Sequence, residues 1–388
     1  MRNLKAFLFG AGMAAILLSS CGNNGMTLSG LDPARFDTTI NEKPVKLYTL
    51  TNKNGMEVCI TNFGGRIVSV MVPDKNGSFV DVVLGYDNIA QYADSANSPS
   101  DYGATIGRYA NRINKGQMVI NNEKIQLPTN NFGHCLHGGP SGWQYQVYDA
   151  EQIDKQTLKL TIVSPDGDNG FPGTVTATAT YKVTDDNAID CTYEATTDKE
   201  TVINMCNHSY FTLTGDPSQP GTNMVLRVNA DNFTPSDASY MTTGEIAPVE
   251  GTPMDFRTPT AICEKMDTSY IYIKNATGYD HNWCLNTFKD GKGDDTQVCA
   301  SLYSPKTGIF MEMYTNEPGV QVYSGNFQGI GPDAKIARKH GLTYPKHVSI
   351  CLESQKYPDS PNKPEWVQAR LNPGEKYYSR AAYKFSIK

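Results

Sequence analysis

The chain has 388 residues, 39% hydrophobic and 19% charged, which excludes intrinsic disorder and supplies enough apolar side chains for a large core. Its 34 Lys and Arg residues against 40 Asp and Glu residues leave a net charge of -6, and no basic run stands out, so nucleic acid is not expected as a partner. The 22 Tyr, 34 Gly and 22 Pro residues favour strands and turns over long helices.

The beginning of the chain has the pattern of a bacterial lipoprotein signal. A positively charged start precedes an apolar run at residues 6–18, which is too short for a comfortable membrane span. The run ends in Leu18-Ser19-Ser20-Cys21, which resembles a lipobox. We therefore predict a cleaved signal at residues 1–20, lipidation of Cys21 and a flexible tether at residues 21–25. An ordinary cleaved signal followed by a chance Cys is the alternative.

This pattern predicts an exported lipoprotein, anchored in the cell envelope on the periplasmic side or at the cell surface. No other apolar run approaches eighteen residues, so membrane contact is expected only through the N-terminal lipid. Phosphorylated cytoplasmic metabolites are not expected as substrates at that location. The sequence does not indicate an oligomeric state.

Short segments of alternating apolar and polar residues follow one another along the rest of the chain. In residues 174–181, Thr alternates with Val, Ala and Tyr, a period of two that places one face in a core. The expected strands are residues 45–50, 56–61, 67–72, 158–163, 174–181, 188–195, 224–228, 296–303, 309–314, 320–323 and 348–352. Turn clusters such as residues 74–77 separate them, and no helical apolar periodicity extends for three turns. The pattern predicts an all-β, mostly antiparallel sandwich, with residues 26–388 as one domain.

Three residue patterns bear on metal sites and disulfides. His134 and His137 have a spacing that could share a metal on a helix, but the glycines around them oppose a helix and no local carboxylate completes the set, so no metal is expected. Residues 166–170 resemble part of a calcium loop but lack its terminal Glu, and a hairpin turn is the better interpretation. Apart from Cys21, eight cysteines remain without a Cys-x-x-Cys pair, and we expect mostly free, buried thiols.

A few His and carboxylate side chains stand in contexts suited to acid–base chemistry. His137 precedes two glycines, and His208 ends an apolar segment, where a buried polar side chain is costly unless it is paired. Glu353 and Asp255 interrupt apolar runs, and burial raises the pKa of a carboxylate and makes it a better base, although an ion pair of Asp255 with Arg257 would give the same pattern. No serine-hydrolase elbow, phosphate loop or dinucleotide fingerprint occurs in a usable context.

Eight motifs in this order resemble the aldose 1-epimerase (galactose mutarotase) family. They are residues 62–67 (NFGGRI), 106–113 (IGRYANRI), 136–139 (LHGG), 166–173 (DGDNGFPG), 207–211 (NHSYF), 279–282 (YDHN), 319–327 (GVQVYSGNF) and 351–355 (CLESQ). The resemblance implies a galactose mutarotase-like β-supersandwich. It also implies interconversion of the α and β anomers of a free monosaccharide, such as galactose or glucose, without a cofactor.

The resemblance further implies roles for individual residues. Glu353 would remove the proton from the anomeric O1 hydroxyl, and His208 would protonate the ring oxygen with support from His137. Four further residues would hold the sugar hydroxyls: Asn111, Arg112, Asp255 and Gln321. His281 is expected to anchor a loop.

Three other functions remain open from the sequence. A hexose-6-phosphate epimerase would need a cationic phosphate clamp, and a sugar-binding lipoprotein could keep the fold without the activity. A glycoside hydrolase would need a second catalytic carboxyl group, which the sequence does not identify. The order of preference among galactose, glucose, xylose and arabinose does not follow from residue spacing.

Overall fold

The structure, a computed structural model, describes residues 25–96 and 100–388. The predicted signal at residues 1–20, Cys21 and the tether up to residue 24 lie outside the described residues. Every pair of named strands is antiparallel, which confirms the predicted all-β class. The described α-helices are short: α1 (Ile89–Ala93), α2 (Ile262–Lys265) and α3 (Ile271–Ala276). Within the described ranges, no helix has the length and apolar character needed to cross a bilayer.

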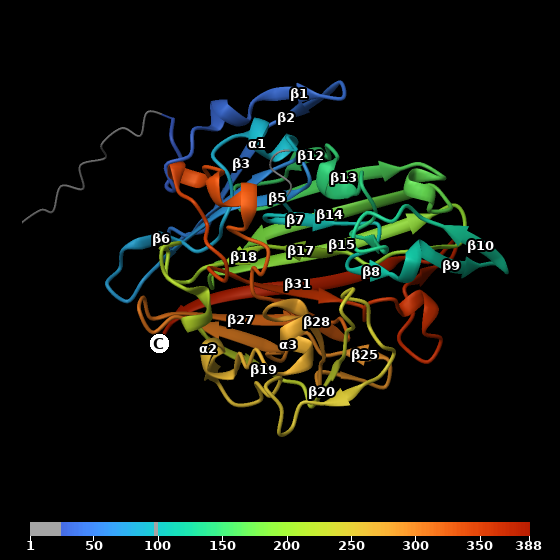
Figure 1. Ribbon diagram of the computed structural model, residues 1–388. Coiled ribbons are helices and arrows are strands. Elements are labelled where there is room, and N and C mark those ends of the chain that lie inside the picture. Colours follow the sequence, from blue (N-terminus) through green and yellow to red (C-terminus); the bar gives the residue numbers. More distant parts are fainter. Residues whose placement is uncertain (1–24, 97–99) are drawn as a thin grey trace, which may run out of the picture.

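The largest sheet has nine strands and forms a broad layer through the molecule (Figure 1). In spatial order it contains β12 (Asp149–Gln152), β13 (Thr157–Ser164), β14 (Val175–Val183), β15 (Ala188–Thr197), β31 (Tyr377–Ile387), β27 (Ile309–Thr315), β26 (Ala300–Tyr303), β19 (Val225–Val228) and β22 (Thr260–Ala261). The alternation predicted for residues 174–181 is confirmed in β14, where Val and Ala residues are buried between more exposed threonines. β31 joins the strands of residues 149–197 to those of residues 225–315.

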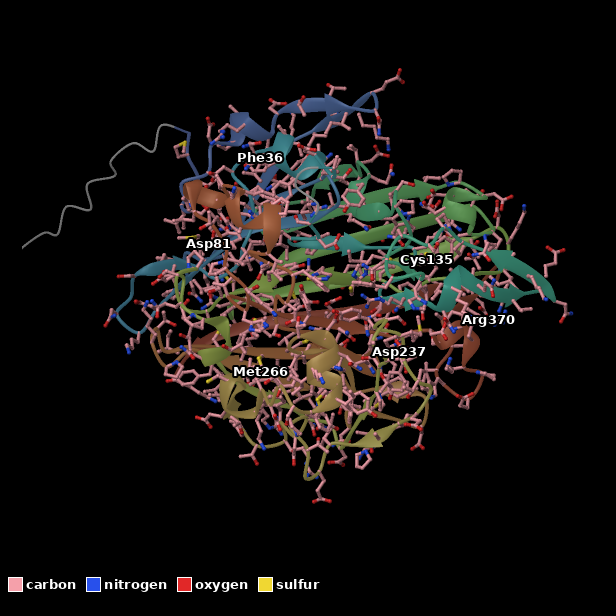
Figure 2. All side chains as sticks on the ribbon, viewed as in Figure 1. Phe36, Asp81, Cys135, Asp237, Met266 and Arg370 are labelled. Atoms are coloured by element: carbon pink, nitrogen blue, oxygen red, sulfur yellow. The ribbon has the colours of Figure 1, made fainter. Side chains whose placement is uncertain are left out.

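A six-stranded sheet packs against the nine-stranded one and carries part of the pocket described below. Its order is β18 (Tyr210–Phe211), β29 (Ile350–Gln355), β28 (Gly319–Tyr323), β23 (Asp280–Cys284), β20 (Asn232–Thr234) and β21 (Ala247–Pro248). The hydroxyl of Tyr383 on β31 donates a 2.9 Å hydrogen bond to the Leu352 carbonyl on β29, within one continuous apolar cluster. Side chains fill the interior between the layers (Figure 2).

The remaining strands form a four-stranded sheet and six two-stranded ladders. The sheet is β3 (Leu47–Thr51), β4 (Glu57–Thr61), β5 (Arg66–Pro73) and β6 (Phe79–Asp81). The ladders are β1 (Thr38–Ile40) with β2 (Lys43–Val45), β7 (Ala104–Ile106) with β17 (Cys206–His208), β8 (Arg112–Ile113) with β11 (Cys135–Leu136), β9 (Gln117–Ile120) with β10 (Glu123–Gln126), β16 (Thr201–Val202) with β30 (Arg370–Leu371), and β24 (Phe288–Lys289) with β25 (Lys292–Gly293).

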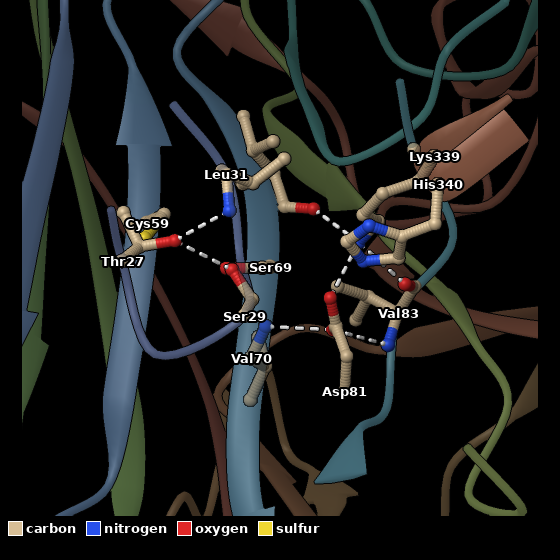
Figure 3. A network of polar contacts seen from close by, with 12 residues as sticks. Thr27, Ser29, Leu31, Cys59, Ser69, Val70, Asp81, Val83, Lys339 and His340 are labelled. Carbon is tan, nitrogen blue, oxygen red and sulfur yellow. Dashed lines mark hydrogen bonds and ion pairs between the residues drawn. The ribbon is translucent and has the colours of Figure 1, made fainter. Parts of the chain in front are cut away.

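A buried lysine fastens the long connection between β28 and β29 to the four-stranded sheet (Figure 3). Lys339 Nζ donates to Asp81 Oδ2 at 2.7 Å and to the carbonyl oxygens of Val68 and Val83 at 2.7 and 2.9 Å. The other carboxylate oxygen of Asp81 accepts from the N–H groups of Val70 and Val83. Because this ammonium is paired and hydrogen-bonded, its burial is tolerated, and it holds the connection in place.

Several strand boundaries differ from the sequence prediction, and one long strand was missed. The expected strand at residues 296–303 begins only at Ala300, because the side chain of Asp294 accepts hydrogen bonds from Thr296 and Gln297 and forms a turn there. β31 was not predicted, although it is the longest strand described. Its inward positions include Ser379 and Ala381, and such small side chains give a weak apolar alternation.

The predictions on cysteines and on the acidic loop are confirmed. All eight cysteines in the described residues are unpaired thiols, and all but Cys263 are buried. Residues 165–174 connect β13 and β14 as a hairpin. In this loop, Asp166 accepts from the Gly173 N–H group and pairs with Lys199.

Candidate active site

A polar cavity of about 360 Å³ opens at the six-stranded sheet. Its size is at the lower end of the range for small-molecule pockets. Its charged and polar lining includes Asp101, Asn111, Arg112, His137, His208, Asp280, Gln321 and Glu353, and its aromatic lining includes Tyr145, Tyr210, Tyr323 and Phe327. Six of the seven residues predicted to act in catalysis or sugar binding are therefore brought together from distant parts of the chain.

Glu353 lies in the interior strand β29, with only 2% of its surface exposed. Burial raises the pKa of Glu353 to about 7, and Asp280 and Asp101 add to the rise, while His208 and Arg112 oppose it. The carboxyl group can therefore change protonation state near neutral pH. This property suits a general base that must also return its proton.

His208 ends β17 and faces Glu353 across the pocket. Its Nε2 atom lies 3.5 Å from Glu353 Oε1, which is longer than a good hydrogen bond. The imidazole stacks on Tyr210 at 5.0 Å between ring centroids and an interplanar angle of 20°, and its Nδ1 is buried without a partner in the described residues. Ring packing therefore orients His208 with its Nε2 beside Glu353.

His137 is held against His208 by a tight turn. Its Nδ1 accepts the Asn111 N–H at 3.1 Å, and the two imidazole rings meet edge to face at 5.3 Å. Burial lowers the pKa of His137 well below its usual value, and His208 and Arg112 lower it further. The neutral ring therefore carries its proton on Nε2, where it can donate. A Cβ on the following Gly138 would lie 2.2 Å from the Gly107 carbonyl oxygen, so the turn requires glycine.

A chain of amide and carboxylate groups lines the wall beside Glu353. Gln321 pairs with Glu353 in the β28–β29 register, and its Nε2 donates to Asp280 Oδ1 at 2.7 Å. Gln355 Nε2 donates to Gln321 Oε1 at 3.3 Å, and Asn111 Nδ2 donates to Gln355 Oε1 at 3.4 Å. The chain fixes the amide orientations, and such groups can recognise sugar hydroxyls.

Arg112 contributes a positive charge to the pocket. Its Nε and Nη2 donate to Asn131 Oδ1 at 3.2 and 2.9 Å. Burial lowers the pKa of Arg112, while Asp280 and Glu353 are among the groups that oppose this effect. A guanidinium has five N–H donors, so this arrangement allows further hydrogen bonds to a ligand.

The structure does not bring Asp255, which was expected to bind sugar, into the cavity. Its carboxylate accepts two hydrogen bonds from the Arg257 guanidinium at 2.9 and 2.8 Å, and it does not line the cavity. This is the local ion pair that the sequence left open. Asp280, which sequence reasoning missed, lies in the pocket instead, and its position in the 279–282 motif was the available signal. His281 lies within β23, where it is buried, and not in a loop.

The described residues do not bring the two histidines considered for a metal together as ligands. Both ring nitrogens of His134 are engaged, Nδ1 by the Lys115 N–H at 3.1 Å and Nε2 by Ser239 Oγ at 2.9 Å. Two sets of side chains in the described residues have ligand atoms within 4.8 Å of one another: Asp101, His137 and His208, and His208, Cys351 and Glu353. Apart from Cys351, these residues line the cavity described above.

Known proteins resemble this chain over most of its length. The family described as aldose 1-epimerase matches residues 46–384. A galactose mutarotase from Mus musculus is 36% identical over 332 residues, covering 86% of this chain and 92% of the relative. An aldose 1-epimerase from Escherichia coli is 37% identical over 348 residues, covering 88% and 96%.

Solved structures resemble the chain over a similar extent. An aldose epimerase homologue from C. elegans gives a TM-score of 0.79 at 26% identity, covering 88% of this chain and 99% of that one. A galactose 1-epimerase from Lactobacillus acidophilus gives 0.76 at 28% identity, covering 90% and 97%. The predicted galactose mutarotase-like fold is thereby confirmed.

Proposed function

The chain belongs to the aldose 1-epimerase family and is an aldose 1-epimerase, and we propose that it interconverts the anomers of free hexoses with Glu353 as the base and His208 as the acid. The observation that carries the assignment is a buried carboxyl group with a pKa near 7 that lies 3.5 Å from a histidine in one cavity. Opening a hemiacetal requires one proton to leave O1 while another reaches the ring oxygen. Glu353 and His208 together supply the base and the acid that this step needs.

The reaction is then a pair of proton transfers. Glu353 takes the proton of the O1 hydroxyl, the C1–O1 bond gains double-bond character, and the C1–O5 bond breaks as His208 donates a proton to O5. Rotation about C1–C2 presents the other face of the aldehyde. On closure O5 attacks C1 and returns its proton to His208, and O1 recovers a proton from Glu353. Each positioned group contributes about 10²–10⁴-fold in rate.

The wall residues hold the sugar during the rotation. Asn111, Arg112, Asp280 and Gln321 present donors and acceptors around the cavity, and neutral His137 adds a donor beside His208. Orienting contacts of this kind keep the open chain near the geometry for closure.

The charge of the cavity supports a neutral sugar over a hexose 6-phosphate. Among the described lining residues, Arg112 is accompanied by three carboxyl groups, those of Asp101, Asp280 and Glu353. A phosphate would need several cations to offset these negative charges. Free hexoses such as galactose and glucose fit this lining better.

Polarimetry on freshly dissolved α-glucose and α-galactose tests the activity. We expect the optical rotation to reach equilibrium faster with the protein than in buffer. A rate no faster than buffer would remove the enzymatic function and favour a sugar-binding lipoprotein.

We also propose export and lipid anchoring through Cys21. The support is the signal pattern at residues 1–20 and the fact that the family match begins only at residue 46. In cells that express the full chain, Cys21→Ser should move the protein from the membrane fraction to the soluble fraction. Membrane association that survives this substitution would contradict the lipid anchor.

A further inference from the structure

Asp101 brings a carboxylate with free acceptor capacity to the cavity. The side chain lines the pocket and is partly exposed, and its Oδ1 atom is buried without a hydrogen-bond partner in the described residues. Native proteins pair most polar atoms that they bury, because an unpaired one costs free energy. The proton transfers of the proposed reaction do not use Asp101. Its carboxylate is therefore suited to accept a hydrogen bond from a ligand.

The backbone on both sides of Asp101 is held in place. The buried guanidinium of Arg66 donates from Nη1 to the carbonyl oxygens of Ser100 and Tyr102, at 3.1 Å in each case. The carbonyl of Asp101 itself accepts the Ala104 N–H at 3.0 Å and closes a turn. These contacts make Asp101 a preorganised group of the pocket.

The same segment is attached to the strand that carries the catalytic acid. β7 pairs with β17, with Ala104 opposite His208 (Figure 1). The Gly103 N–H donates to the His208 carbonyl at 3.0 Å. As a result, one ligand atom from each of Asp101, His137 and His208 lies within 4.8 Å of the other two.

His208 lies between Asp101 and the catalytic base. It belongs to two groups of side chains whose ligand atoms lie within 4.8 Å of one another, one with Asp101 and His137 and the other with Cys351 and Glu353. Within the described residues, no such group joins Asp101 directly to Glu353. The order across the pocket is therefore Glu353, His208, Asp101.

A pyranose bound for the proposed reaction presents its atoms in a matching order. Its O1 lies at Glu353 and its ring oxygen O5 at His208. O5 is bonded to C1 on one side and to C5 on the other, and C5 carries the exocyclic carbon C6. The C6 group is therefore the first substituent beyond O5 in the direction of Asp101.

We propose that Asp101 binds the O6 hydroxyl of a hexose and so selects sugars that carry a hydroxymethyl group on C5. The inference rests on the proposed function, because the roles of Glu353 and His208 orient the sugar. A hydroxyl group both donates and accepts hydrogen bonds. O6 can donate to the Asp101 carboxylate and accept from the Nε2–H group of neutral His137. Free hexoses are thereby preferred over pentoses and 6-deoxy sugars.

The charge of Asp101 also disfavours sugars with an anionic C6 group. Burial raises the pKa of both Glu353 and Tyr145, and the negative charge of Asp101 adds to both shifts, so this charge acts across the pocket. A uronate or a 6-phosphate would bring a second negative charge close to Asp101, and like charges repel strongly at a partly buried site. A neutral hydroxymethyl group avoids this repulsion.

Glucose, 6-deoxyglucose and xylose test the contact in steps, because 6-deoxyglucose lacks only the O6 hydroxyl and xylose lacks C6 altogether. For the wild type, we expect kcat/KM from polarimetry to be about tenfold to a hundredfold higher for glucose than for either analogue, the scale of a hydrogen bond to a charged group. In Asp101→Ala, the ratio of glucose to 6-deoxyglucose should fall to within about threefold of one, through loss of activity on glucose. Asp101→Asn, which has nearly the same shape, should give an intermediate ratio.

The ratio of two sugars does not depend on the fraction of enzyme that is folded, so a folding defect cannot imitate the expected result. An effect of the substitution on Glu353 reaches both sugars and cancels in the same way. Asp255→Ala is the matched control, because the Asp255 carboxylate lies outside the cavity, and its ratio should equal that of the wild type. A wild-type ratio within about twofold of one, or a ratio that Asp101→Ala leaves unchanged, overturns the proposal.

Glucuronate gives a readout of the opposite sign. Asp101→Asn removes the repulsion of its C6 carboxylate, so kcat/KM for glucuronate should rise by about threefold or more while that for glucose falls. A purely structural role of Asp101 would lower both values. A parallel fall on the two sugars therefore overturns the proposal.

Calorimetric binding separates this inference from the proposed function. If the wild type accelerates mutarotation of no sugar, the proposed function fails. Glucose binding that is tighter than 6-deoxyglucose binding, and that loses this advantage in Asp101→Ala, would still support the contact between Asp101 and O6. Equal affinities of the wild type for the two sugars would overturn it.

Discussion

Replacement of Glu353 by Gln separates the catalytic and structural consequences of its burial. Because the folded pKa is raised from 4.5 to about 7, the free energy of unfolding of the wild type falls as pH rises through this interval. The difference of 2.5, at about 1.36 kcal/mol for each pKa unit, gives a total of about 3 kcal/mol. Gln has nearly the same shape and does not ionise. Glu353→Gln should therefore be more stable than the wild type by about that amount above pH 7, with no such gain below about pH 4.

The same substitution should lower kcat by about 10²–10⁴-fold, because a neutral amide cannot accept the O1 proton. In the wild type, activity should rise with pH as Glu353 loses its proton, with a midpoint near 7. Polarimetry measures the rate, and urea unfolding at about pH 4 and about pH 8 measures the stability. Wild-type kcat in Glu353→Gln would refute the assignment of the base. A stability difference that does not change with pH would refute the ionisation argument.

Other substitutions test the remaining parts of the site and its scaffold. His208→Asn should lower kcat by about 10²–10⁴-fold in the polarimetric assay, and an unchanged kcat would contradict its role as acid. Asp280→Asn should raise KM, whereas Asp255→Asn should leave KM unchanged because Arg257 holds that carboxylate outside the cavity; the opposite result would return Asp255 to the site. Gly103→Ala should lower the free energy of unfolding by more than about 2 kcal/mol. Its Cβ would lie 1.9 Å from the Ile67 carbonyl oxygen at a φ of 66°, and an unchanged urea midpoint would contradict this packing.

The site could be predicted to the extent that its residues stand in distinctive local patterns. Glu353, His208 and His137 lie in short motifs that place a polar group against an apolar or glycine-rich segment. Asp255 stands in a similar pattern, and only the structure shows that its neighbour Arg257 neutralises it. Asp280 has no apolar run around it, and its place in the cavity depends on the pairing of β23 with β28.

Features that depend on distant segments could not be predicted. β14 was predicted because its inward residues are large or branched at both ends, which makes the alternation strong. β31 was missed because small Ser and Ala side chains occupy inward positions, and the charged residues Arg380 and Lys384 interrupt the strand. The rings of Phe132, Tyr240 and Phe327 contact one another, and no local pattern indicates that these three loops meet.

The place of β31 in the nine-stranded sheet determines when the protein can complete its fold. β31 pairs with β15 on one side and with β27 on the other, yet it follows every other strand of this sheet in the chain. Until residues 377–387 have been synthesised, β15 and β27 each keep an open edge, and the sheet remains in two separate parts. Pairings across such long stretches of chain also form slowly. A nascent chain of this design therefore stays incompletely folded until late in synthesis.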